Sequence, residues 1–183
     1  MSTSWVSKSA RIAALMFLLS ASAYAAERRL LTVTEVMEIN APPAAVWNAI
    51  KSFDGIATWI PVVAKCYLTE GSNGTVGALR RAELKNGWQV DEQLEAYSDE
   101  VMSLSYSIFN GPFPIDNYLA TISVRANQAG TGSIMIWTSR FQRRNPLANP
   151  PEGEGDATLT AAITGIYRES MAIIKKSVET ATK

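Results

Sequence analysis

The sequence predicts an α+β domain in which a seven-stranded, curved antiparallel sheet wraps around one long C-terminal helix, with two short helices after the first strand. Three observations give this prediction. Apolar and polar residues alternate over most of the chain, and Gly-, Asn- and Pro-rich breakers divide that alternation into short segments. Residues 156–180 instead repeat their apolar positions every three or four residues, as a helix does.

The first 25 residues have the pattern of a cleavable signal peptide. A positively charged region precedes an apolar run at 12–19, and Ala23-Tyr24-Ala25 gives the small-x-small motif that a signal peptidase requires. The apolar run is shorter than the ~20 residues of a spanning helix, although an uncleaved anchor remains the alternative. We therefore expect cleavage after Ala25, a periplasmic or secreted protein without stable membrane insertion after cleavage, and one mature domain over 26–183.

The mature chain begins with a strand and two short helices. Residues 31–39 alternate as a strand, and the prolines that follow are tolerated in the first turn of a helix at 44–51. A shorter helix is predicted over 54–59, because Pro61 ends it. Six further strands are predicted at 62–70, 75–84, 88–97, 101–109, 115–125 and 133–143.

The C-terminal segment differs from the rest. Residues 145–155 are rich in Pro and Gly and are predicted to be irregular. Residues 156–180 predict a long amphipathic helix with Asp156 as a candidate cap. Gly165 lies inside that helix at a cost of about 1 kcal/mol relative to alanine. We therefore expect another segment to pack closely against it.

Composition argues against several classes of function. The 183 residues carry 17 basic and 17 acidic side chains without a basic run, so nothing indicates a nucleic-acid partner. The chain has no histidine, which removes the usual general base and the commonest nitrogen ligand of zinc. We expect no metal and no cofactor. The single cysteine, Cys66, alternates with apolar residues and is predicted to be an unreactive, buried thiol.

Residues 80–94 predict a hairpin with an ion pair on its apolar face. A two-residue turn would set polar positions of one arm against apolar positions of the other. A three-residue loop at 85–87 removes that conflict and places Arg80 opposite Glu92. Apolar replacements are often as stable as a buried ion pair, so stability alone is a weak reason for it. Either the pair fixes the register, or Arg80 donates to an anionic ligand group while Glu92 holds the guanidinium.

Aromatic residues on neighbouring strands predict the rest of a ligand site. Tyr and Trp join apolar surface to a polar edge, which suits a pocket that orients one polar group, although such rings also fill ordinary cores. The candidate ligand-binding residues are Arg80, Glu92, Tyr106, Tyr118, Trp137, Trp88, Phe141 and Phe113. Phe113 belongs to a loop at 111–114 that either covers the cavity mouth or is an ordinary turn. Glu35 is a fainter candidate, with a solvent-facing position as its alternative, and no catalytic residue is assigned.

Five segments, with the order of the elements, carry a resemblance to a known superfamily. They are INAPPAAVWNAIKSFDGIATWIP, LKNGWQVDEQL, PFPIDNYLATISV, IMIWTSRF and NPPEGEGDATLTAAITGIYRESMAIIKK. They resemble the SRPBCC superfamily of helix-grip domains, which includes START lipid-transfer domains and polyketide cyclases. The resemblance implies a cavity between the sheet and the C-terminal helix, without fixing a reaction.

A narrower resemblance comes from the export signal, the Asn-Pro-Pro loop at 149–151 and the helix around 165–167. Together they resemble a periplasmic branch that includes an accessory protein of bacterial methanol oxidation. The family often has an aromatic-His-Pro step where this chain reads Trp59-Ile60-Pro61. Chemistry that depends on that histidine therefore does not carry over.

We expect an exported, non-catalytic protein that binds a small hydrophobic molecule between sheet and helix. Two alternatives stay open. One is an accessory protein for a periplasmic oxidoreductase such as a methanol dehydrogenase system, which contacts a dehydrogenase or cytochrome through 145–155 and the acidic outer faces. The other is a cyclase- or dehydratase-type enzyme in which Glu92 or a tyrosine transfers protons and Arg80 stabilises an oxyanion. The missing histidine disfavours the enzyme.

Overall fold

A computed structural model describes residues 29–181, and the predicted signal peptide at 1–25 lies outside the described residues. The strands are β1 (Leu30–Ile39), β2 (Val63–Glu70), β3 (Leu79–Leu84), β4 (Gln89–Ser98), β5 (Ser103–Asn110), β6 (Ile115–Ala126) and β7 (Ser133–Arg143). The helices are α2 (Pro43–Ile50), the short 3-10 helix η1 (Gly55–Thr58) and α3 (Asp156–Ala181). The predicted order of elements is confirmed. Within the described part of the chain, no helix is both long and apolar enough to cross a membrane.

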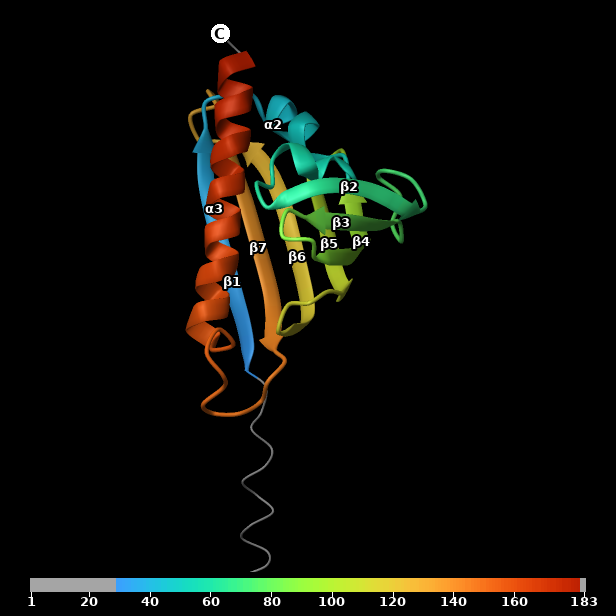
Figure 1. Cartoon of the computed structure of the whole chain (residues 1–183). Coiled ribbons are helices and arrows are strands. Elements are labelled where there is room, and N and C mark those ends of the chain that lie inside the picture. The colour runs from blue at the N-terminus through green and yellow to red at the C-terminus, as the bar shows by residue number, and fades with distance from the viewer. Residues whose placement is uncertain (1–28, 182–183) are drawn as a thin grey trace, which may run out of the picture.

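The seven strands form one antiparallel sheet in the order β1-β7-β6-β5-β4-β3-β2. Helix α3 packs along β1 and β7, while the sheet curves so that β2, β3 and β4 stand away from the helix (Figure 1). This is the predicted helix-grip arrangement, and the fold class is confirmed. The curvature separates α3 from the far strands and leaves side chains of both to line the space between them.

Helix α3 forms because its apolar side chains recur on one face. That face is buried against the sheet through Leu159, Tyr167, Met171, Ile174 and Val178. Burial of apolar surface at about 25 cal/mol per Å² holds the helix there. The expectation of close packing at Gly165 is wrong, because a Cβ built there would meet nothing within 4 Å.

The hairpin of β3 and β4 has the predicted register. Arg80 pairs with Glu92, and the amide of Leu84 donates to the carbonyl of Trp88 at 2.7 Å, which closes the three-residue loop. Gly87 in that loop has a φ of +87°, a conformation that glycine adopts without steric cost. The alternation of apolar and polar residues was therefore sufficient to select both the loop length and the register.

The start of the predicted strand at 75–84 is wrong, because β3 begins only at Leu79. Thr75 donates to the carbonyl of Ser72, and Ala78 donates to the carbonyl of Thr75, so consecutive turns occupy this stretch. Glycines at 71, 74 and 77 have positive φ and permit these turns.

The sheet opens between β5 and β6. Their pairing ends at Ser107 and Leu119, although β5 continues to Asn110. β6 pairs with β7 through a bulge after Asp116, where Asn117 has a φ of +53°. The opening forms a mostly polar hollow of about 480 Å³, which shares four wall residues with the apolar cavity described below.

Candidate functional site

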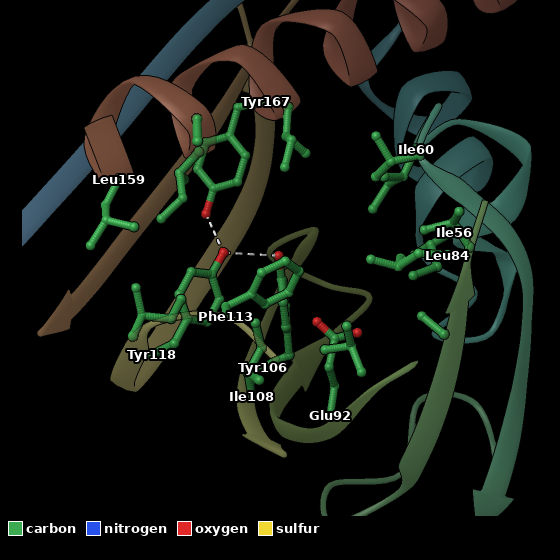
Figure 2. A pocket seen from close by; sticks show the side chains of 18 of the residues that line it. Ile56, Ile60, Leu84, Glu92, Tyr106, Ile108, Phe113, Tyr118, Leu159 and Tyr167 are labelled. Carbon is green, nitrogen blue, oxygen red and sulfur yellow. Dashed lines mark hydrogen bonds between the residues drawn. The ribbon is translucent and has the colours of Figure 1, made fainter. Parts of the chain in front are cut away.

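An apolar cavity of about 160 Å³ lies between α3, the η1 segment and the curved part of the sheet (Figure 2). Its apolar wall comes from Ile56, Ile60, Val62, Val63, Ala82, Leu84, Val90, Ile108, Phe113, Pro114, Ile115, Leu159, Ala162, Ile163 and Ile166, and its polar or amphipathic wall from Glu92, Tyr106, Tyr118, Trp137 and Tyr167. Few polar groups converge on mostly apolar walls, as in small-molecule sites.

Three tyrosine hydroxyls from β5, β6 and α3 form a chain along one side of the cavity (Figure 2). The hydroxyl oxygens of Tyr118 and Tyr167 are 2.5 Å apart, whereas those of Tyr106 and Tyr118 are 3.4 Å apart. Burial raises the pKa of Tyr106 and of Tyr118 well above the ordinary value, and raises the pKa of Tyr167 to about 12. The three phenols are therefore neutral at physiological pH and act through hydrogen bonds.

Trp137 of β7 presents a buried donor. It is 1% exposed, and its ring stacks on Tyr167 at 3.9 Å between centroids and meets Trp59 edge-on at 5.5 Å. Its Nε1–H has no acceptor among the described residues. A buried donor left unpaired costs about 1–3 kcal/mol, and this nitrogen is closed off from a water-sized molecule by the side chains around it.

The ion pair lies in the wall beside the tyrosines. Arg80 is 3% exposed and donates from Nε to Oε2 of Glu92 at 2.6 Å. Another guanidinium nitrogen, Nη1, donates to the main-chain carbonyl of Phe53. The guanidinium carbon also lies 4.1 Å from the ring centroid of Phe53 and 5.0 Å from that of Tyr106. The arginine is thus enclosed by partners from three separate segments.

Five of the sequence-predicted site residues line the cavity: Glu92, Tyr106, Tyr118, Trp137 and Phe113. The carboxylate of Glu92 points into the space between the tyrosines and the side formed by η1 and β3 (Figure 2). The loop at 111–114 contributes Phe113 and the following proline to the wall.

Three other predicted residues lie outside the lining. Arg80 sits behind Glu92, so it positions that carboxylate rather than facing the cavity. Phe141 is fully buried and packs against Tyr118 at 6.4 Å between centroids. Trp88 is 47% exposed and lies in the hairpin loop just before β4 begins.

The contacts of Trp88 and Glu35 show where these two candidate residues lie. Trp88 contacts Phe113 edge-on at 6.1 Å, so the hairpin loop packs against the 111–114 loop, whose Phe113 lines the cavity. Glu35 accepts from Arg168 of α3 at 2.8 Å, a pair between β1 and the helix that lies away from the cavity lining.

Sequence reasoning missed Tyr167, whose hydroxyl bonds directly to that of Tyr118. A signal was present: Tyr167 is a tyrosine on the apolar face of α3, with a polar tip that needs a partner. The contribution of Ile56 and Ile60 was also missed. No pattern in the sequence indicates that the segment after α2 folds over the far end of the sheet.

Comparison with known proteins identifies the family. Residues 31–179 match the family described as polyketide cyclase / dehydrase and lipid transport, so the chain belongs to that family. The resemblance predicted from the sequence is thereby confirmed. The abscisic acid receptor PYL10 of Arabidopsis thaliana is 31% identical over 108 residues, which are 56% of this chain and 58% of the receptor. The chain thus spans little more than half the length of this curated relative.

Solved structures agree along more of the chain. The protein XoxI from Bacillus cereus is 27% identical with a TM-score of 0.71, and the match covers 83% of this chain and 98% of XoxI. A structure from Thermobifida fusca is 25% identical with a TM-score of 0.67, covering 80% of this chain and 92% of that one. Both likenesses extend over the sheet and the long helix that enclose the cavity.

Proposed function

We propose that the protein binds a small, mostly apolar molecule in this cavity without transforming it. The observation that carries the proposal is the cavity wall, which is mostly apolar and is interrupted by Glu92, Tyr106, Tyr118, Trp137 and Tyr167. The apolar wall supplies affinity, and the few polar groups orient the ligand.

The polar groups favour binding over catalysis. The raised pKa values of the phenols keep their protons in place, so none is a phenolate near neutral pH. Glu92 already accepts a hydrogen bond from Arg80, which occupies one carboxylate oxygen. A general base works best when it is free to take a proton from the substrate.

The predicted signal peptide makes this an exported carrier or sensor. Cell fractionation tests the location, and N-terminal sequencing of the exported protein tests cleavage after Ala25. Recovery in the cytoplasm with an intact leader would contradict this part of the proposal.

Native mass spectrometry of the protein purified from its own host tests binding directly. We expect a retained ligand on the wild type. Ala161 and Ala162 are neighbouring exposed residues of α3, and of the two it is Ala162 that lines the cavity, which gives a matched pair of variants. Ala162→Trp should lose the retained ligand, whereas Ala161→Trp should keep it. Equal occupancy of both variants, or an empty wild type that also fails to bind toluene, would contradict the proposal.

A second candidate function is assistance to a periplasmic dehydrogenase or cytochrome. It is favoured by the likeness to XoxI over 98% of that protein and by Leu147, an apolar residue that is 56% exposed in the irregular segment 145–155. Copurification with one such partner should be lost in Leu147→Asp. It should persist in Val101→Asp, which changes an apolar residue at another loop that is 65% exposed. Loss in both variants or in neither would count against a surface at 145–155.

A further inference from the structure

The charge inside the cavity is set by one carboxylate. Glu92 is the charged residue among the described residues that line the space. The cation that balances it, Arg80, lies in the wall behind, held by Glu92, by the carbonyl of Phe53 and by two aromatic rings. A ligand in the cavity therefore meets the carboxylate of the pair and not its guanidinium.

A ligand that carried its own carboxylate would be disfavoured for two reasons. Its charge would leave water for mostly apolar walls, where desolvation is costly without a paired cation. It would also lie in the same small space as the carboxylate of Glu92, and like charges at short range repel more strongly where water is excluded. Arg80 already has its partners, and it would have to lose some of these contacts to bind a second anion.

The remaining polar groups suit a neutral oxygen. The hydroxyl of Tyr106 is 3.4 Å from that of Tyr118, longer than the usual ~2.8 Å, so it is loosely held and available to a ligand. The Tyr106 hydroxyl can donate to a carbonyl or hydroxyl oxygen on a ligand.

The volume limits the size of that ligand. The cavity holds about 160 Å³, close to the ~150 Å³ of an apolar protein cavity that binds benzene. The cavity is partly open to solvent, so a large terpenoid or steroid skeleton would extend out of it and not be enclosed. A single ring with a short substituent fills it.

We propose that the cavity selects a small neutral molecule of about one ring that bears a carbonyl or hydroxyl oxygen, and that it discriminates against carboxylic acids. This inference rests on the proposed binding function. It also separates this chain from its plant relatives, whose name states that they are receptors of an acid.

Calorimetry with three matched probes tests the proposal on purified protein at neutral pH. Toluene reports the apolar cavity, benzyl alcohol adds a hydroxyl, and benzoate adds a carboxylate to the same ring. We expect benzyl alcohol to bind at least about tenfold more tightly than benzoate, the cost of placing an unpaired charge in the cavity being larger than 1.4 kcal/mol. Benzoate binding as tightly as benzyl alcohol would overturn the inference while leaving the binding function intact. If none of the three probes binds, both fail.

Two variants test the assigned groups. Tyr106→Phe should weaken benzyl alcohol by about 3- to 10-fold through one lost hydrogen bond, and should leave toluene unchanged. Tyr97→Phe is the control, because that hydroxyl bonds to Asp99 outside the cavity. Glu92→Gln should narrow the gap between benzyl alcohol and benzoate, because it removes the repelling charge. Folding of each variant is checked by circular dichroism, and an unchanged gap in a folded Glu92→Gln protein would overturn the role of that charge.

Discussion

Loss of one partner of the buried ion pair should destabilise the protein strongly. Arg80→Met keeps much of the side-chain volume but leaves the carboxylate of Glu92, 6% exposed, without its partner at 2.6 Å. Removing one partner of such a pair costs about 3–5 kcal/mol. The carbonyl of Phe53 loses its donor as well, which acts in the same direction. At about 2–4 °C per kcal/mol for a domain of this size, Tm should fall by about 6–20 °C.

Urea unfolding followed by tryptophan fluorescence measures the effect in a double-mutant cycle. Its four proteins are the wild type, Arg80→Met, Glu92→Leu and the double variant. The double variant buries no unpaired charge. The sum of the losses of unfolding free energy in the two single variants should therefore exceed the loss in the double variant by more than about 2 kcal/mol. Lys51→Met is the control, because Lys51 pairs with Asp99 at 3.5 Å where both side chains are exposed.

The result that would refute this reasoning is specific. If Arg80→Met unfolds at the same urea concentration as Lys51→Met, with a cost below about 1 kcal/mol, then Glu92 does not depend on Arg80 for its burial. Additive single costs would lead to the same conclusion.

Other positions give predictions of differing sign. Gly165→Ala should stabilise by about 0.5–1 kcal/mol because its site on α3 is open, whereas Gly132→Ala should destabilise by about 1–3 kcal/mol because its Cβ would stand 2.5 Å from a main-chain oxygen of β1. Thermal unfolding measures both, and equal signs would contradict the packing described. Hydrogen bonding to Arg81 lowers the pKa of Asp91 from its ordinary 3.8, so the stability it contributes is present above that pH and is lost as the pH falls through the lowered pKa. The difference in Tm between wild type and Asp91→Asn should therefore shrink in acid, and a constant difference would argue against it. Burial raises the pKa of the Cys66 thiol to about 11, so iodoacetamide at pH 8 should label the folded protein far more slowly than the urea-unfolded protein. Similar rates would show an accessible thiolate.

The elements that the sequence predicts well share a strong local pattern. Alternation of apolar and polar residues located every strand, and it selected the loop that places Arg80 opposite Glu92. The same period failed at 75–78, because an alternating pattern in the sequence does not reveal that glycines with positive φ convert the chain into turns. Local pattern thus fixes the faces of a strand better than it fixes the ends.

The site was harder to predict, because lining a cavity is a property of three dimensions. Strand alternation correctly predicted that Tyr106, Tyr118 and Trp137 face the cavity. It predicted the same for Trp88, which is exposed and lies past the end of the strand. Strand alternation also cannot distinguish a residue that lies behind the cavity lining from one that lines the cavity. The position of Arg80 behind Glu92 depends on Phe53, which the sequence places far from either.

On the proposed function, the Arg80–Glu92 pair limits how a binding preference can evolve. The same carboxylate maintains the fold, through its arginine, and sets the charge that a ligand meets. A mutation of Glu92 that admits an acid would also release a buried guanidinium, so selection for the new ligand and selection for stability would oppose each other. Tyr106 carries no such double role through its hydroxyl, which is only loosely bonded. Single substitutions near the tyrosines would therefore suffice for binding a new ligand of the same charge. Binding a ligand of a different charge would require at least two coordinated substitutions.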